Sequence, residues 1–125
     1  MAPLYVVRSA GSVEEHIVGG VPLGALDDPE YGLVELELAP RDALVMMSDG
    51  VPETRNPERG ELGYDGVMAM LAQLAVRYAA SDAQLTADDM LRDVLGVCGR
   101  WVAPGSFEDD VTVVVIRVRQ PSQPS

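Results

Sequence analysis

The chain has 125 residues, of which 47% are hydrophobic and 23% charged, and this is the size and composition of one globular domain. Its formal net charge is −11, with 20 acidic residues against nine arginines and no lysine, which argues against binding to nucleic-acid phosphates or to an anionic membrane surface. One cysteine and one histidine exclude an intramolecular disulfide and any metal site that needs several thiolates or imidazoles.

Short strands are predicted in the first third of the chain. Residues 4–8 contain β-favouring Val and Tyr, and residues 13–18 follow a Gly-Ser turn as the return strand of a hairpin. Residues 19–30 are rich in Gly and Pro and predict a loop. Residues 33–38 alternate apolar and acidic side chains, which predicts a strand with one buried face. Residues 43–47 are apolar throughout and predict a strand inside the sheet.

Two helices and a last strand are predicted after an ordered loop that follows the fourth strand. Residues 64–79 have apolar side chains at helical spacing. Thr86 is the expected N-cap of the second helix, and Asp89 adds a favourable charge near its positive end. The expected apolar stripe of this helix comprises Leu91, Val94, Leu95, Cys98 and Trp101. Residues 111–118 predict the final strand and residues 120–125 a flexible tail. The expected fold class is α+β, with about four strands, two helices and one final strand.

Acidic residues stand where two apolar strands end and begin. Asp49 directly follows the strand over residues 43–47, and Asp109 precedes the last strand. Each motif alone is better explained as a turn, and only the pair points to a site. If the two strands are antiparallel neighbours, Asp49 and Asp109 meet at one edge of the sheet. Carboxylates that close repel each other unless a cation lies between them, and oxygen ligands suit Mg²⁺ or Mn²⁺.

The order of these motifs resembles the C-terminal half of PPM-type metal-dependent serine/threonine phosphatases, in the branch of stage II sporulation protein E. The matching segments are residues 22–24, 38–42, 48–56 and 109–115. The resemblance covers residues 1–119 and implies part of the PPM β-sandwich flanked by helices. It implies that Asp49 and Asp109 are metal ligands and that metal-activated water hydrolyses phosphoserine or phosphothreonine without a covalent phosphoenzyme.

The resemblance is to the second half of the family domain, and the early acidic motifs of the family are not found in this sequence. It therefore implies a weak or partial Mn²⁺ or Mg²⁺ site and no or very low turnover by this chain alone. Gly50, Asp110, Glu53 and Arg55 are secondary candidates, with Glu53 as a further acid near the metal and Arg55 as a phosphate ligand; each is also explained as a loop residue. Arg41 stands where the family usually has glycine.

The partners expected from the resemblance are phosphorylated proteins of the anti-sigma-factor-antagonist type. Without a second sheet, the strands over residues 43–47 and 111–118 would expose an apolar face, so we expect a homodimer or docking onto another chain. The alternative function is a non-catalytic, partner-binding remnant of a phosphatase domain in a regulatory pathway. An unrelated acidic α+β domain is a third interpretation. The sequence shows no signal peptide or apolar span, so the expected location is cytoplasmic.

Overall fold

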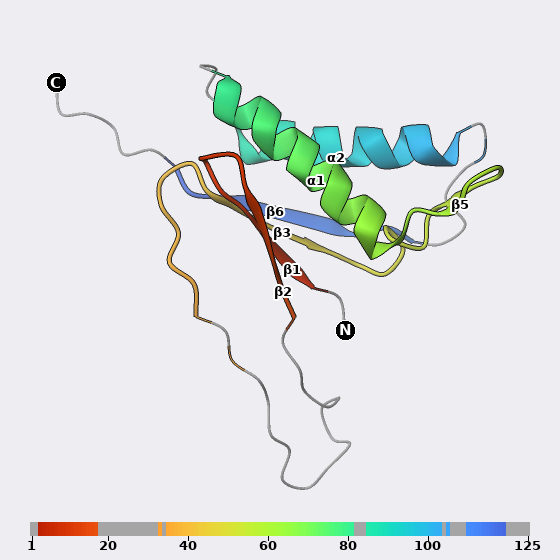
Figure 1. Ribbon diagram of the computed structural model, residues 1–125, viewed down its shortest axis with the longest axis horizontal. Coiled ribbons are helices and arrows are strands. Elements are labelled where there is room, and N and C mark those ends of the chain that lie inside the picture. The colour runs from red at the N-terminus through yellow and green to blue at the C-terminus, as the bar shows by residue number, and fades with distance from the viewer. Residues whose placement is uncertain are drawn as a thin grey trace, which may run out of the picture.

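The chain forms a four-stranded antiparallel sheet with two helices packed on one face (Figure 1). A computed structural model describes residues 3–17, 33, 35–81, 85–103, 105 and 110–119. The order of strands in the sheet is β2-β1-β3-β6. The elements are β1 (Leu4–Val7), β2 (Val13–His16), β3 (Ala43–Met47), α1 (Gly63–Ala80), α2 (Ala87–Val102) and β6 (Val113–Arg117). This arrangement confirms the α+β class.

β3 and the edge strand β6 are antiparallel neighbours, as a meeting of Asp49 with Asp109 requires. β3 and β6 are antiparallel, with Met47 opposite Val113 at one end and Ala43 opposite Arg117 at the other. The residues that follow β3 and those that precede β6 therefore lie at the same edge of the sheet.

The two faces of the sheet differ because side chains alternate along each strand. One face carries buried side chains that pack against the helices: Tyr5, Val7, Ala43, Val45 and Met47. The helices contribute Val67, Leu71, Leu74, Met90, Val94 and Cys98 to the same core. On the opposite face, Met46, Val114 and Ile116 are 37%, 43% and 48% exposed. The described part of the chain thus covers one face of the sheet and leaves an apolar surface on the other.

The start of α2 is capped as the sequence predicts. The Thr86 hydroxyl accepts a hydrogen bond from the Asp89 backbone N–H, and the Asp89 carboxylate accepts one from the Thr86 N–H. The buried line of α2 is Met90, Val94, Cys98 and Val102. The predicted stripe is therefore confirmed at Val94 and Cys98 and wrong at Leu95, which is 39% exposed. Neither helix in the described ranges is long and apolar enough to span a bilayer.

Two local predictions differ from the structure. Residues 33 and 35–38 form no strand, since they pair with neither edge strand of the sheet, β2 or β6. The carbonyl of Glu37 instead accepts a hydrogen bond from Arg8 Nη1 at 2.8 Å. The loop after β3 contains a small hairpin, β4 (Arg55–Asn56) with β5 (Gly60–Glu61). The predicted loop over residues 19–30 and the predicted tail lie outside the described residues.

Candidate functional site

The turn that follows β3 packs directly against the segment that leads into β6. The Ser48 N–H donates to the Thr112 carbonyl, and the Ser48 Oγ accepts from the Thr112 N–H, both at 2.9 Å. A Cβ placed on Gly50 would lie 2.3 Å from the backbone carbonyl oxygen of Asp110. Such a distance is far inside van der Waals contact, so only glycine at this position allows the turn to approach Asp110.

Asp49 lies exposed in this turn, and a tyrosine from α1 holds its carboxylate. The Tyr64 hydroxyl donates to Asp49 Oδ1 at 2.9 Å. This hydrogen bond, then partial burial and the negative charges of Asp49 and Glu53, raise the pKa of Tyr64 above its ordinary value. The phenol therefore stays a proton donor to Asp49. The charge of Glu53 also acts on the Tyr64 hydroxyl, so a second carboxylate lies near this site.

The loop beyond Asp49 is ordered by hydrogen bonds to its own backbone and to α2. The buried Thr54 donates from Oγ1 to the Gly50 carbonyl at 2.9 Å, and the Glu53 N–H donates to the Asp49 carbonyl at 3.1 Å. The indole N–H of Trp101, near the end of α2, donates to the Thr54 carbonyl at 3.2 Å. These contacts hold the acidic turn rigidly at the sheet edge.

The structure places the remaining site candidates as follows. The backbone of Asp110 lies against Gly50, and its side chain is exposed. Arg55 lies on β4, where its Nη2 pairs with Glu61 Oε1 at 3.2 Å. Asp109 lies outside the described residues, so the meeting of its side chain with Asp49 stays a prediction. Within the described ranges, no three His, Cys, Asp or Glu side chains cluster as a metal site.

The donor atoms at this edge fit a hard cation better than a soft one. Asp49, Glu53 and the hydroxyl of Tyr64 offer only oxygen. The nitrogen and sulfur ligands of the chain lie elsewhere, with His16 on β2 beside Glu14 and Cys98 buried in the core. Such a site can hold a divalent cation with water in the remaining positions.

Sequence reasoning did not find the roles of Tyr64 and Thr54. Tyr64 was expected as the first residue of a helix, and its contact with Asp49 depends on where α1 begins relative to the sheet edge. Thr54 lies four positions after Gly50, which suits a hydroxyl-to-carbonyl bond across one turn. This spacing is the one feature of the sequence that could have indicated the role of Thr54. It does not single Thr54 out, because the same spacing is common in loops.

Three comparisons with known proteins bear on this fold. The family model of stage II sporulation protein E (SpoIIE) matches residues 1–119. The SiaA-PP2C domain of Pseudomonas aeruginosa superposes with a TM-score of 0.65 at 18% identity, covering 93% of this chain and 42% of that one. The phosphatase domain of the cell fate determinant SpoIIE from Bacillus subtilis superposes with a TM-score of 0.64 at 20% identity, covering 99% and 51%.

A second structure of the B. subtilis domain, presoaked with Mn, has a TM-score of 0.64 at 20% identity and covers 98% of this chain and 49% of that one. The chain thus spans about half the length of these solved domains. No curated protein sequence matches the chain.

Proposed function

Since this chain belongs to the stage II sporulation protein E (SpoIIE) family of PP2C-like phosphatase domains, we propose that it supplies Asp49 and Asp109 to a metal-dependent phosphoserine/phosphothreonine phosphatase site. The observation that carries the proposal is the contact of Gly50 with the backbone of Asp110. This contact joins the two acidic motifs, although they are sixty positions apart in the sequence. The SpoIIE and SiaA phosphatase folds support the same assignment.

Each described residue has a separate role in this proposal. Asp49 offers a carboxylate to a hard divalent cation, with Asp109 as the second ligand. Tyr64 orients the Asp49 carboxylate through its hydrogen bond. Thr54 stiffens the turn by bonding the Gly50 carbonyl. When bound, Mg²⁺ or Mn²⁺ supplies the positive charge that polarises a phosphate ester and lowers the pKa of water.

The proposed substrate class is a phosphorylated protein of the anti-sigma-factor-antagonist type. Support for this class comes from membership of the SpoIIE family. We expect weak turnover by this chain alone, because two carboxylates hold one cation loosely and cannot form the two-metal pair that clamps both the attacking and the leaving oxygen.

Calorimetric titration with Mn²⁺ tests the proposed metal site. Wild type should bind Mn²⁺ measurably, and Asp49→Asn and Asp109→Asn should each weaken binding at least tenfold. Asp88→Asn is the matched control, because this exposed aspartate lies at the start of α2 and pairs with Arg92. Equal binding by wild type and by the double Asp49/Asp109 variant would contradict the proposal.

A second candidate function is the non-catalytic binding of a partner, and the apolar sheet face opposite the helices favours it. Met46, Val114 and Ile116 expose their side chains there. Release of phosphate from a phosphoserine protein in the presence of Mn²⁺ separates the two functions. Slow, Asp49-dependent release supports the phosphatase, whereas Mn²⁺ binding without any release favours the binding module.

A further inference from the structure

A second polar feature lies at the end of the sheet opposite to Asp49. Arg41 precedes β3 and Arg117 ends β6, whereas Asp49 follows β3 at its other end. The pairing of Ala43 with Arg117 keeps both arginines at one edge. The side chains around the two arginines line a shallow hollow that is partly open to solvent. This pocket is therefore separate from the proposed metal site.

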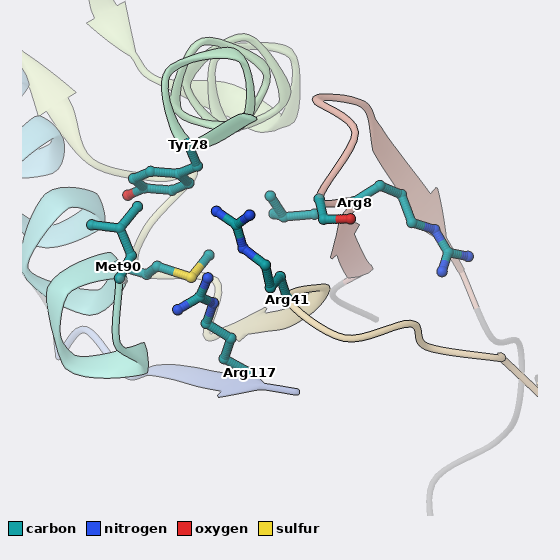
Figure 2. A pocket seen from close by; sticks show the side chains of 8 residues that line it. Arg8, Arg41, Tyr78, Met90 and Arg117 are labelled. Atoms are coloured by element: carbon teal, nitrogen blue, oxygen red, sulfur yellow. The ribbon is translucent and has the colours of Figure 1, made fainter. Parts of the chain in front are cut away.

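The pocket combines an apolar wall with two cationic groups. Its apolar wall comprises Val7, Tyr78, Leu85 and Met90. Figure 2 shows the side chains of Arg41 and Arg117 reaching into the space below Tyr78 and beside Met90. The guanidinium of Arg8 points away from this space and pairs with Glu14 and Asp42.

Neither pocket arginine forms an ion pair with an acidic side chain in the part of the chain that the structure describes. Arg41 Nη2 donates to the Ser81 carbonyl at 3.4 Å, which is a long hydrogen bond. Burial and the positive charge of Arg41 lower the pKa of Arg117, and Asp89 offsets this effect only in part. The Asp89 carboxylate already serves the α2 cap.

The backbone at Arg41 is the second unusual observation. Arg41 has φ of 73°, and it is the one non-glycine residue with positive φ in the described ranges. Its N–H donates to the Val118 carbonyl at 2.8 Å, which holds the turn beside the end of β6. Glycine would make this turn without strain. A strained residue is kept where the surrounding structure enforces it, and such residues gather at functional sites.

We propose that Arg41 and Arg117 form a phosphate-binding pocket, which takes the dianion of inorganic phosphate or of a phosphorylated side chain. Guanidinium groups match phosphate oxygens with paired N–H donors, and two of them together carry the positive charge that balances a dianion. The apolar wall lowers the local dielectric and strengthens the attraction. The proposal does not depend on the phosphatase activity proposed above, because it uses residues at the other end of the sheet.

Titration with inorganic phosphate in EDTA tests the pocket without any contribution from a metal. The pH is kept above about 8, so that the dianion dominates for inorganic phosphate as well as for phosphate monoesters. Amide and arginine side-chain NMR shifts should move saturably at the pocket. Arg41→Gly and Arg117→Gln should each weaken binding at least tenfold. Arg100→Gln is the matched control, because this exposed arginine lies near the other end of α2.

The Arg41→Gly variant separates binding from folding. Glycine relieves the left-handed backbone, so its melting temperature should equal or exceed that of wild type while phosphate affinity falls. No saturable binding by wild type, unchanged binding by both pocket variants, or equal loss in Arg100→Gln would overturn the proposal.

A phosphoserine peptide and its unphosphorylated form distinguish the two sources of phosphate. Tighter binding of the phosphopeptide than of inorganic phosphate assigns the pocket to a phosphorylated chain. Equal binding of phosphopeptide and inorganic phosphate assigns it to free phosphate. Equal binding of the two peptides overturns the proposal.

Discussion

Gly50 lies so close to Asp110 that a Cβ at position 50 would stand 2.3 Å from the Asp110 carbonyl oxygen. Gly50→Ala must therefore push the acidic turn away from the segment before β6. We expect this variant to lose roughly 1–3 kcal/mol of unfolding free energy, the range for a forced overpacking. We also expect it to bind Mn²⁺ more weakly than wild type. Urea unfolding and calorimetry measure the two effects.

Gly99→Ala is the matched control for that experiment. Gly99 lies inside α2, where an added Cβ meets no atom within 4 Å. Alanine there should raise stability by roughly 0.5–1 kcal/mol, because glycine costs that much in a helix. A loss of stability in both variants would show that the chain tolerates no added methyl group, and would contradict a specific role for Gly50.

Removing the Tyr64 hydroxyl should weaken the metal site with little effect on the fold. Tyr64→Phe deletes the donor to Asp49 Oδ1, and the residue is 39% exposed, so the stability change should stay within about 0.5 kcal/mol. Partners that orient metal ligands typically contribute tenfold or more to affinity. We therefore expect Mn²⁺ affinity to fall about tenfold in calorimetry. Unchanged affinity would remove Tyr64 from the site.

Asp42 links the first hairpin to the turn before β3. Its side chain is 3% exposed, and it accepts hydrogen bonds from the backbone N–H groups of Ser9 and Ala39 and from Arg8 Nη1 at 2.8, 2.9 and 3.0 Å. Burial by itself would raise the pKa of Asp42, but these donors outweigh it and hold the pKa below its ordinary value of 3.8. Asp42→Asn should therefore lose roughly 1.5–3 kcal/mol at neutral pH, the range for hydrogen bonds to a charged group.

The pH dependence of this loss follows from the lowered pKa. The folded chain binds fewer protons at Asp42 than the unfolded chain, so the stabilisation is complete above pH 3.8 and is lost as the pH falls through the folded pKa. The difference in unfolding free energy between wild type and Asp42→Asn should therefore shrink below that pH. A difference that stays constant down to acid pH would contradict a charged Asp42. Asp88→Asn, at an exposed position, should change stability by less than about 0.5 kcal/mol.

Tyr5 carries a polar atom that the core does not satisfy. It is 0% exposed, and within the described residues its hydroxyl has no hydrogen-bond partner. Burial, then the charges of Glu15 and Tyr64, raise its pKa to about 12. Tyr5→Phe should thus stabilise the chain by about 1 kcal/mol. Tyr78→Phe is the contrasting control and should destabilise, because Tyr78 donates to Asp93 Oδ2 at 2.6 Å. Denaturant unfolding measures the change in unfolding free energy of each variant, and a loss of stability in Tyr5→Phe would contradict the prediction.

The exposed sheet face should drive self-association when no other chain covers it. Ile116 is 48% exposed there. Light scattering after size exclusion should show a dimer at high concentration, and Ile116→Glu should shift it to monomer. Val76→Glu is the matched control, because Val76 is 62% exposed on α1, away from this face. A wild-type monomer at every concentration would contradict the prediction.

Local chemistry in the sequence determined most of the secondary structure and the two acidic motifs. The cap at Thr86, the helical period over residues 64–79 and the apolar strand over residues 43–47 all follow from interactions within a few positions. Tertiary structure decided what depends on neighbours. Residues 33–38 alternate as a strand should, yet the described ones pair with neither edge strand of the sheet, β2 or β6.

The same division holds for the two polar sites. The sequence marked Asp49 as a metal-ligand candidate only together with Asp109, through the possible meeting of the two acidic motifs and their resemblance to PPM phosphatases. Only the antiparallel pairing of β3 with β6 brings Gly50 against Asp110 and, at the other end, sets Arg41 beside Arg117. Contacts between residues sixty or more positions apart depend on which strands become neighbours in the sheet, and the periodicity within one segment does not specify its partner strand.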